Sequence, residues 1–269
     1  MKKPLILITN DDGIYSPGLW AVIESVKEFG DLLIVAPISQ QTSMGRSFAK
    51  GPDVGIVEKV ILHINGADVV AFGVHGSPAL AVSHGVLELS DKKPDLCISG
   101  INYGENLGLS ITCSGTVGAA FEADSHGIPS IAVSRQADLS MQHSNVFADL
   151  DWAACKYITK KVVEEVLKSG FPSKVSILNI NVPDKATEHT EVRYTKQSRH
   201  NYSAFIKPEP RDFSKAYTLK SRIDLNRDDI DRGSDIYAIA FDKVISITPL
   251  TWDLSMNVET NLKGSLYEK

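Results

Sequence analysis

The sequence predicts an α/β fold in which a mostly parallel sheet carries helices on both faces. The first observation is an apolar run at residues 5–9, followed by a polar loop and a helical pattern at 17–26. The second is another apolar run at 31–37, because a strand, helix and strand of this length favour a right-handed crossover between parallel strands. The third is the run at 95–99, which ends in a glycine-rich loop where the backbone approaches another group closely.

The first strand ends at residues 10–13, Asn-Asp-Asp-Gly. Adjacent carboxylates repel each other and resist burial, so they require a cation, a salt partner or open water. Gly13 allows a tight turn, and Ser16 with Pro17 is typical of a helix N-cap followed by a first helical residue. Ligand sites of open α/β sheets lie beyond the carboxyl ends of the strands, so a divalent metal fits this loop best. The structural alternative is that both acids only cap the helix in solvent.

Two further loops are expected at the same edge of the sheet. Residues 38–47 follow the second strand and include Thr42, and residues 100–108 follow a later strand and include Asn102. Hydroxyl and amide oxygens suit a hard cation, so these two residues, the acidic pair and waters make a magnesium or manganese shell. The alternative is that Thr42 bonds its own backbone and that Asn102 forms a turn.

The triplet Ser-Gly-Thr at 114–116 begins a helix of small residues. Its two hydroxyls and its unpaired backbone N–H groups suit a phosphate, although an N-cap alone is the more frequent role of such a triplet. Arg46, Lys196 and Arg199 are the cations considered for substrate contacts, with a solvated surface charge as the alternative. The seven histidines show no metal-binding spacing.

The remaining core elements continue the alternation of strands and helices. Apolar and polar residues alternate in the segment 54–73 on both sides of an Asn-Gly turn, which predicts an antiparallel hairpin. Gly-Ser-Pro at 76–78 caps an apolar helix, and residues 151–168 form an amphipathic helix. Residues 127–134 and 175–182 are predicted strands.

The character of the sequence changes after the last of these strands. Residues 185–235 are charged and rich in turn formers, and 236–240 and 244–250 are predicted strands. We interpret residues 1–184 as a catalytic core and 185–269 as a β-rich C-terminal extension and oligomerisation segment that packs on it. The extension is expected to lean on another subunit, because alone it would bury little apolar surface.

Composition places the chain among ordinary soluble proteins. Of 269 residues, 43% are hydrophobic and 23% charged, and the formal charge of -5 argues against a surface for a nucleic-acid polymer. The three cysteines are widely spaced, which argues against a disulfide framework or a zinc site and fits a reducing compartment. We find no signal-peptide core and no run long enough to span a membrane, and we expect a cytoplasmic protein.

Taken together, the motifs resemble the survival protein SurE family, in order and from residue 5 to about 255. That family comprises metal-dependent 5'-nucleotidases, also described as 3'-nucleotidases, acid phosphatases and exopolyphosphatases. The matching segments are Ile-Leu-Ile-Thr-Asn-Asp-Asp-Gly-Ile at 6–14, Ser-Pro-Gly at 16–18, Val-Ala-Pro at 35–37, Ser-Gly-Ile-Asn-Tyr-Gly-Glu-Asn at 99–106, Ser-Gly-Thr-Val at 114–117, Leu-Asn-Ile-Asn-Val-Pro at 178–183 and Ser-Ile-Thr-Pro-Leu at 246–250.

The resemblance implies a Rossmann-like core, a β-hairpin and C-terminal extension exchanged between subunits, and a homo-oligomer, either dimer or tetramer. It also implies one divalent cation per subunit, Mg²⁺ or Mn²⁺, with the metal ligands Asp11, Asp12, Thr42 and Asn102. The chain departs from the family at three positions: Thr42 replaces the usual Ser, Cys113 the usual Tyr and Leu80 a frequent Asp. These departures keep the metal ligands and bear on substrate preference.

The functional hypothesis is a phosphatase that hydrolyses nucleoside 5'-monophosphates through a metal-activated water, with 3'-monophosphates and short polyphosphate as further substrates. A phosphatase with an aspartyl-phosphate intermediate is disfavoured, because Asn10 stands where the nucleophilic Asp would be. The other alternative is a metal-dependent nucleotide sensor without turnover. The expected catalytic residues are Asp11, Asp12 and Asn10, and the expected phosphate-binding residues are Asn10, Gly45, Ser114, Gly115 and Thr116.

Overall fold

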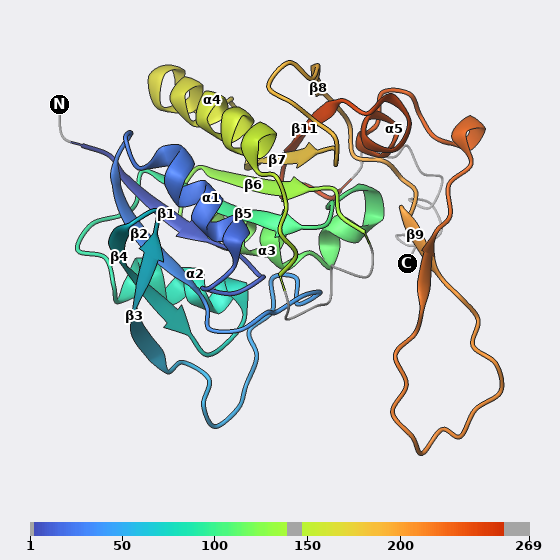
Figure 1. The fold of residues 1–269 in the computed structure, drawn as a ribbon, viewed down its shortest axis with the longest axis horizontal. Helices are drawn as coiled ribbons and strands as arrows, with labels where there is room; N and C mark the ends of the chain where they lie inside the picture. The colour runs from blue at the N-terminus through green and yellow to red at the C-terminus, as the bar shows by residue number, and fades with distance from the viewer. Residues whose placement is uncertain (1–2, 139–146, 256–269) are drawn as a thin grey trace, which may run out of the picture.

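A computed structural model describes residues 3–138 and 147–255. Its centre is a sheet with the strand order β3-β4-β2-β1-β5-β6-β7-β11-β8 (Figure 1). Neighbours in this order are parallel except β3 with β4 and β7 with β11, which confirms the predicted mostly parallel sheet. The strands are β1 (Leu5–Thr9), β2 (Asp31–Pro37), β3 (Val57–Ile64), β4 (Ala67–Val74), β5 (Leu96–Tyr103), β6 (Ser130–Arg135), β7 (Ile177–Val182), β8 (Val192–Tyr194) and β11 (Ile245–Leu250).

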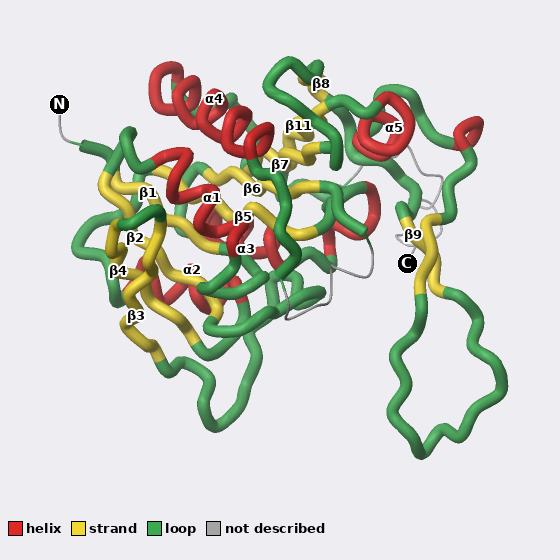
Figure 2. The backbone as a smooth tube through the Cα atoms, in the orientation of Figure 1, coloured by secondary structure: helices red, strands yellow, loops and turns green. Residues whose placement is uncertain are grey.

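Helices cover both faces of this sheet (Figure 2). One face carries α1 (Pro17–Val26) and α4 (Ala153–Ser169), and the other carries α2 (Pro78–Leu87) and α3 (Gly115–Ser125). In β1, Ile6 and Ile8 pack in the cluster with α1 and α4, whereas Leu7 packs in the cluster with α2 and α3. The strand is therefore apolar throughout because both of its faces are buried. No helix in the described part of the chain is long and apolar enough to span a membrane.

Serine side chains begin three of these helices, as the sequence predicts. Ser16, Ser77 and Ser114 each accept a hydrogen bond from a backbone N–H in the first turn of α1, α2 and α3, respectively. The first turn of α1 also lies directly on β5, because a Cβ at Gly18 would collide with the carbonyl oxygen of Ile101. These caps place the start of α1 and the start of α3 at the carboxyl ends of the parallel strands.

The segment 236–240, which we predict as a strand, is helical. It lies in α5 (Asp235–Tyr237) and in the continuing helical turn η3 (Ala238–Asp242). Ile236 and Ile239 are three residues apart and both fully buried, and Ser234 caps the first turn. The prediction is wrong because a short apolar run fits either a strand or a buried helix.

The C-terminal extension completes the core sheet. The predicted strand at 244–250 is confirmed as β11, which pairs antiparallel with β7, and the short strand β8 pairs with β11 at the sheet edge. Two short helical turns, η1 (Gly108–Thr112) and η2 (Arg227–Asp229), connect the remaining segments. The division of the chain into a core to residue 184 and an extension after it stays a prediction.

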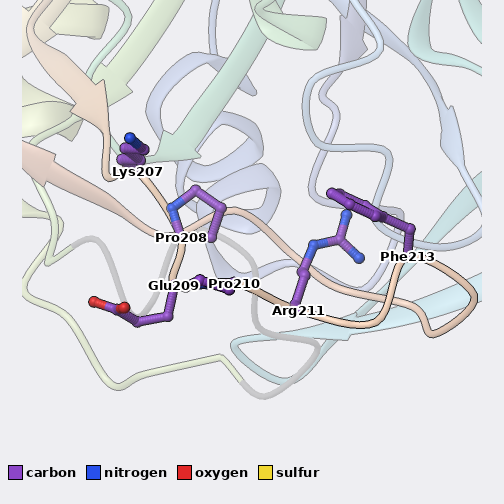
Figure 3. A pocket seen from close by; sticks show the side chains of 6 residues that line it. All are labelled: Lys207, Pro208, Glu209, Pro210, Arg211 and Phe213. Atoms are coloured by element: carbon purple, nitrogen blue, oxygen red, sulfur yellow. The ribbon is translucent and has the colours of Figure 1, made fainter.

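An arm formed by residues 203–223 extends away from the body of the molecule (Figure 1). Its base is the antiparallel pair β9 (Ser203–Phe205) and β10 (Ser221–Ile223). In the loop beyond this base, the Arg211 guanidinium lies 4.9 Å from the ring centre of Phe213 and 5.0 Å from that of Tyr217. Figure 3 shows the side chains that line a hollow in this loop, those of residues 207–211 and Phe213. Exchange of the arm between subunits stays a prediction.

Candidate active site

The acidic loop after β1 is held closed by its own asparagine. The Gly13 N–H donates to Asn10 Oδ1 over 3.1 Å, and Asn10 Nδ2 donates to the Gly13 carbonyl over 3.0 Å. Gly13 has a φ of +103°, which a residue with a side chain rarely adopts. The turn directs Asp11 and Asp12 into the protein, where they are 4% and 2% exposed. The structure thus contradicts the alternative in which both acids cap a helix in solvent.

Asp11 lies against the first turn of α3. The Thr116 hydroxyl donates to Asp11 Oδ1 over 2.6 Å. A Cβ at Gly115 would stand 2.7 Å from both Cβ and Oδ2 of Asp11, so only glycine lets the helix approach this closely. Ser114 begins the same turn by accepting the Val117 N–H over 3.1 Å. The triplet predicted to bind phosphate therefore touches one member of the acidic pair directly.

Asp12 faces the other two loops. Its Oδ2 accepts the backbone N–H of Tyr103 over 3.1 Å, and its Oδ1 lies 3.4 Å from Gln40 Nε2. The Gln41 N–H also donates to the Asp11 carbonyl over 2.7 Å. Thr42 directly follows Gln41, and Asn102 directly precedes Tyr103. The loops after β1, β2 and β5 therefore converge as predicted, which brings the segments of all four predicted metal ligands to one corner.

The pKa values of both carboxyl groups are raised. Burial raises the pKa of Asp11 to about 6. The hydrogen bond from the Thr116 hydroxyl acts in the opposite direction and lowers this pKa. Burial, and then the charge of Asp11, raise the pKa of Asp12 well above its ordinary value. Keeping both groups ionised at neutral pH therefore calls for a positive charge at this corner.

The donor set fits a hard cation. Within residues 3–138 and 147–255, no three His, Cys, Asp or Glu side chains gather to hold a metal ion. A cation beside the acidic pair would thus complete its shell with neutral oxygens and water, which Mg²⁺ and Mn²⁺ accept and Zn²⁺ sites rarely use. Thr42 and Asn102 carry side-chain oxygens of this kind.

A buried network of asparagines supports the site, and the sequence reasoning missed it. Asn106 Nδ2 donates to Ser134 Oγ over 2.8 Å and lies 3.4 Å from the Thr116 hydroxyl that holds Asp11. The Asn106 carbonyl accepts hydrogen bonds from Nδ2 of Asn179 over 2.9 Å and from Nδ2 of Asn181 over 3.1 Å. The signal was present, since asparagines at alternate positions of an otherwise apolar strand need polar partners inside the fold.

Of the three cations considered for substrate contacts, Arg46 has a side-chain partner elsewhere, and Lys196 and Arg199 are exposed. Arg46 pairs with Glu122 of α3 over 2.7 Å. Lys196 bonds through its backbone to Gly233 and Asp235 in the C-terminal extension, and Arg199 is exposed. Gly45 does reach the start of α3, where its N–H donates to the Cys113 carbonyl over 3.0 Å. Of the histidines, His63, His75, His84, His126 and His189 each lie next to an acidic side chain, and His143 lies outside the described residues.

Comparison with known proteins identifies the family. The family model described as survival protein SurE matches residues 6–204. A 5'-nucleotidase SurE of Methanocella arvoryzae is 39% identical over 95% of this chain and 94% of its own. One of Methanothermobacter thermautotrophicus is 41% identical over 75% of this chain and 76% of its own. The crystal structure of a SurE protein from Aquifex aeolicus superposes with a TM-score of 0.70 and 30% identity over 98% of both chains.

Proposed function

Since the chain belongs to the survival protein SurE family, we propose that it hydrolyses nucleoside 5'-monophosphates to nucleoside and phosphate with the help of a divalent cation. The observation that carries the proposal is the buried pair Asp11 and Asp12 at the carboxyl end of β1. The helix start that we assign to phosphate binding touches this pair from one side, and two loops bearing neutral oxygens meet it from the other. Curated relatives named 5'-nucleotidase SurE support the same function.

The residues that would hold the cation are Asp11, Asp12, Thr42 and Asn102, with one Mg²⁺ or Mn²⁺ per subunit. When bound, such an ion polarises a phosphoryl oxygen and makes the attacking water more acidic. One carboxylate oxygen of the acidic pair accepts the proton of that water. Thr116 orients Asp11 through its hydrogen bond to Oδ1.

The phosphate would be held at the first turn of α3. The dipole of a helix start favours anions, and Gly45 and Gly115 both lie at this start. Ser114 Oγ accepts a backbone N–H and retains its own proton to donate to a phosphate oxygen. One Asn10 amide hydrogen is bonded to Gly13, and the second can donate to the substrate. Preorganised donors of this kind stabilise the charge that develops on the transferred group.

We extend the proposal to nucleoside 3'-monophosphates and short polyphosphate, because the same metal and helix start would accept any terminal phosphate. We also propose a cytoplasmic homo-oligomer, either dimer or tetramer. The second candidate function is a nucleotide sensor that binds through the same corner without turnover. The acidic pair favours the enzyme, since a carboxylate beside the bound phosphate provides the base that hydrolysis needs.

The test is to incubate the metal-free protein with Mn²⁺ or Mg²⁺ and a panel of nucleoside 5'- and 3'-monophosphates, and to measure released phosphate. We expect metal-dependent release, which Asp11→Asn abolishes while circular dichroism stays unchanged. Asp91→Asn, a change at an exposed acid, serves as the matched control and should retain full activity. Tight nucleotide binding without phosphate release would support the sensor instead. Normal hydrolysis by Asp11→Asn would disprove the assigned site.

A further inference from the structure

Arg46 lies at the end of the loop 38–47, next to the residues that we assign to metal and phosphate binding. Its Nε donates to Glu122 Oε2 over 2.7 Å, and its terminal nitrogen lies 3.4 Å from Ser125 Oγ. The guanidinium carbon stands 5.1 Å from the ring centre of Trp252. Arg46 therefore faces α3 and the C-terminal extension, and its Nε and one terminal nitrogen have their partners there.

Glu122 is only 4% exposed and collects partners from three segments. Besides Arg46 it accepts the Ser83 hydroxyl of α2 over 2.7 Å and lies 3.1 Å from His126 Nε2. A buried carboxylate is costly unless it is paired and hydrogen-bonded. Because Arg46 is its permanently charged partner, the ion pair ties the loop to α3 more firmly than an exposed pair would.

The backbone of the loop is seated on the same helix. A Cβ at Gly118 would collide with the carbonyl of Gly45 and stand 2.6 Å from the N of Arg46. The Gly45 N–H donates to Cys113, just before α3. The helix thus touches the acidic pair at its first turn, through Thr116, and holds the loop at its second turn and at Glu122. At 1.5 Å per residue, these contacts lie within roughly 10 Å along one rigid helix.

Trp252 covers the ion pair from the C-terminal extension. Its ring centre lies 4.6 Å from that of Phe121, and its indole N–H donates to Asp124. A cation beneath an aromatic ring gains electrostatic stabilisation. A residue more than two hundred positions away in sequence therefore contributes to the placement of the loop.

We propose that Arg46, held between Glu122 and Trp252, is a positioning residue that docks the loop 38–47 on α3 and so sets the place of Thr42 and Gly45 relative to Asp11. This inference rests on the proposed metal-dependent phosphatase for the roles of Thr42 and Gly45. It assigns Arg46 to the protein's own architecture, in place of the substrate contact considered from the sequence.

The first test measures docking without metal or substrate. Hydrogen exchange of the amides of Gln41 and Gly45 reports the two backbone bonds that fix the loop. We expect Arg46→Ala and Glu122→Gln each to speed this exchange by about tenfold or more, and Trp252→Ala to speed it by a smaller factor. Glu24→Gln is the matched control, because Glu24 pairs with Lys156 across α1 and α4 and does not touch the loop. Unchanged exchange in Arg46→Ala and Glu122→Gln would overturn the proposal.

The second test measures the response to Mn²⁺. Residues that orient a metal ligand typically change metal affinity by about 10- to 100-fold, so both variants should raise the half-saturating Mn²⁺ concentration by about tenfold, by calorimetry and by phosphate release. The double variant Arg46→Ala/Glu122→Gln should equal the worse single variant, because both act on one interaction. Arg46→Lys keeps the positive charge but lacks the planar guanidinium donors, so its half-saturating Mn²⁺ concentration should lie between those of the wild type and Arg46→Ala.

The outcomes separate this proposal from the proposed function. Faster exchange together with a weaker Mn²⁺ response supports the positioning role. Faster exchange with an unchanged Mn²⁺ titration overturns the link to Thr42. A raised KM for the nucleotide in Arg46→Ala alone, with Glu122→Gln normal, shows a substrate contact and also overturns it. If the wild-type protein releases no phosphate from any nucleotide, the proposed function fails, while the exchange measurements still decide whether Arg46 docks the loop.

Discussion

Asp11 is buried where its negative charge is costly. Burial raises its pKa to about 6 from the ordinary 3.8, so the folded protein holds this proton more tightly than the unfolded chain does. The resulting stabilisation is complete below about pH 4 and is lost as the pH rises through about 6. In metal-free protein at about pH 7.5, Asp11→Asn should therefore raise the unfolding free energy by up to about 3 kcal/mol, and the gain should vanish towards pH 4.

Urea unfolding in the presence of a chelator measures this difference across the pH range. Asp91→Asn, at an exposed acid, should match the wild type throughout. Added Mn²⁺ should stabilise the wild type more than Asp11→Asn, because a ligand that binds the native state stabilises it by mass action. A loss of stability in Asp11→Asn at neutral pH would show that Asp11 has a compensating partner within the protein.

Thr116 offers a second test at the level of one residue. Its hydroxyl donates to Asp11 over 2.6 Å, and a hydrogen bond to a charged group contributes about 1.5–3 kcal/mol. Thr116→Val keeps the shape and removes the donor, so phosphate release should fall by about ten- to a hundredfold. Thr116→Ser keeps the hydroxyl and should retain most activity. Equal activities of the two variants would mean that this hydrogen bond does not orient Asp11 for catalysis.

Residues whose role is local were predictable from the sequence, and residues whose role depends on distant partners were not. The capping serines and the acidic turn at 10–13 depend on neighbours within a few positions, and the structure confirms them. Asn106 depends on Asn179 and Asn181, more than seventy positions away. Arg46 likewise depends on Glu122 and is read as a free cation when that partner is unknown.

Among the elements, the helical stretch at 235–242 shows how a distant contact fixes local structure. Asp235 is fully buried at its start, and its carboxylate accepts the N–H groups of Gly108, Ser198 and Ile236 over 2.7–2.9 Å. These bonds join the loop after β5 to the C-terminal extension. An apolar run alone does not reveal them, which is why the sequence suggested a strand here.

Removing this carboxylate should be strongly destabilising. Asp235→Ala leaves three buried N–H groups without their acceptor, and breaking a buried charged hydrogen-bond network costs about 3–5 kcal/mol. Thermal and urea unfolding measure the loss. Asp231→Ala is the matched control, because Asp231 accepts the Gly233 N–H at an exposed turn, and it should cost less than about 1 kcal/mol. Similar losses in the two variants would argue against Asp235 as the anchor.

At the scale of the whole molecule, the fold class followed from the sequence but the strand order did not. Alternating apolar runs and helical patterns indicate a parallel sheet. No local sequence pattern predicts that β4 extends the sheet beyond β2 or that β11 lies between β7 and β8. The core sheet therefore includes strands from the segment interpreted as an extension. The arm at 203–223 is the part of this segment that lies outside the body, and the sequence predicts that the segment as a whole, residues 185–269, contacts another subunit.

The arm presents apolar side chains that the described chain does not cover. Phe205, Phe213 and Ile223 are 75%, 86% and 52% exposed. A two-stranded hairpin is marginally stable in isolation, so an arm of this length gains stability when a second copy packs on it. We therefore expect the wild-type protein to be a dimer or tetramer by light scattering.

Replacing residues 206–220 with Asn-Gly keeps the pairing of β9 with β10 and removes the exposed loop. This variant should shift to a monomer while the thermal unfolding of the core sheet changes little, because the deleted residues pair with none of its strands. Leu87→Ser, at a position 69% exposed on the end of α2, controls for the loss of surface apolarity and should keep the wild-type assembly. If the shortened protein assembles like the wild type, subunit contacts lie elsewhere, and the edge strands β3 and β8 become the next surfaces to test.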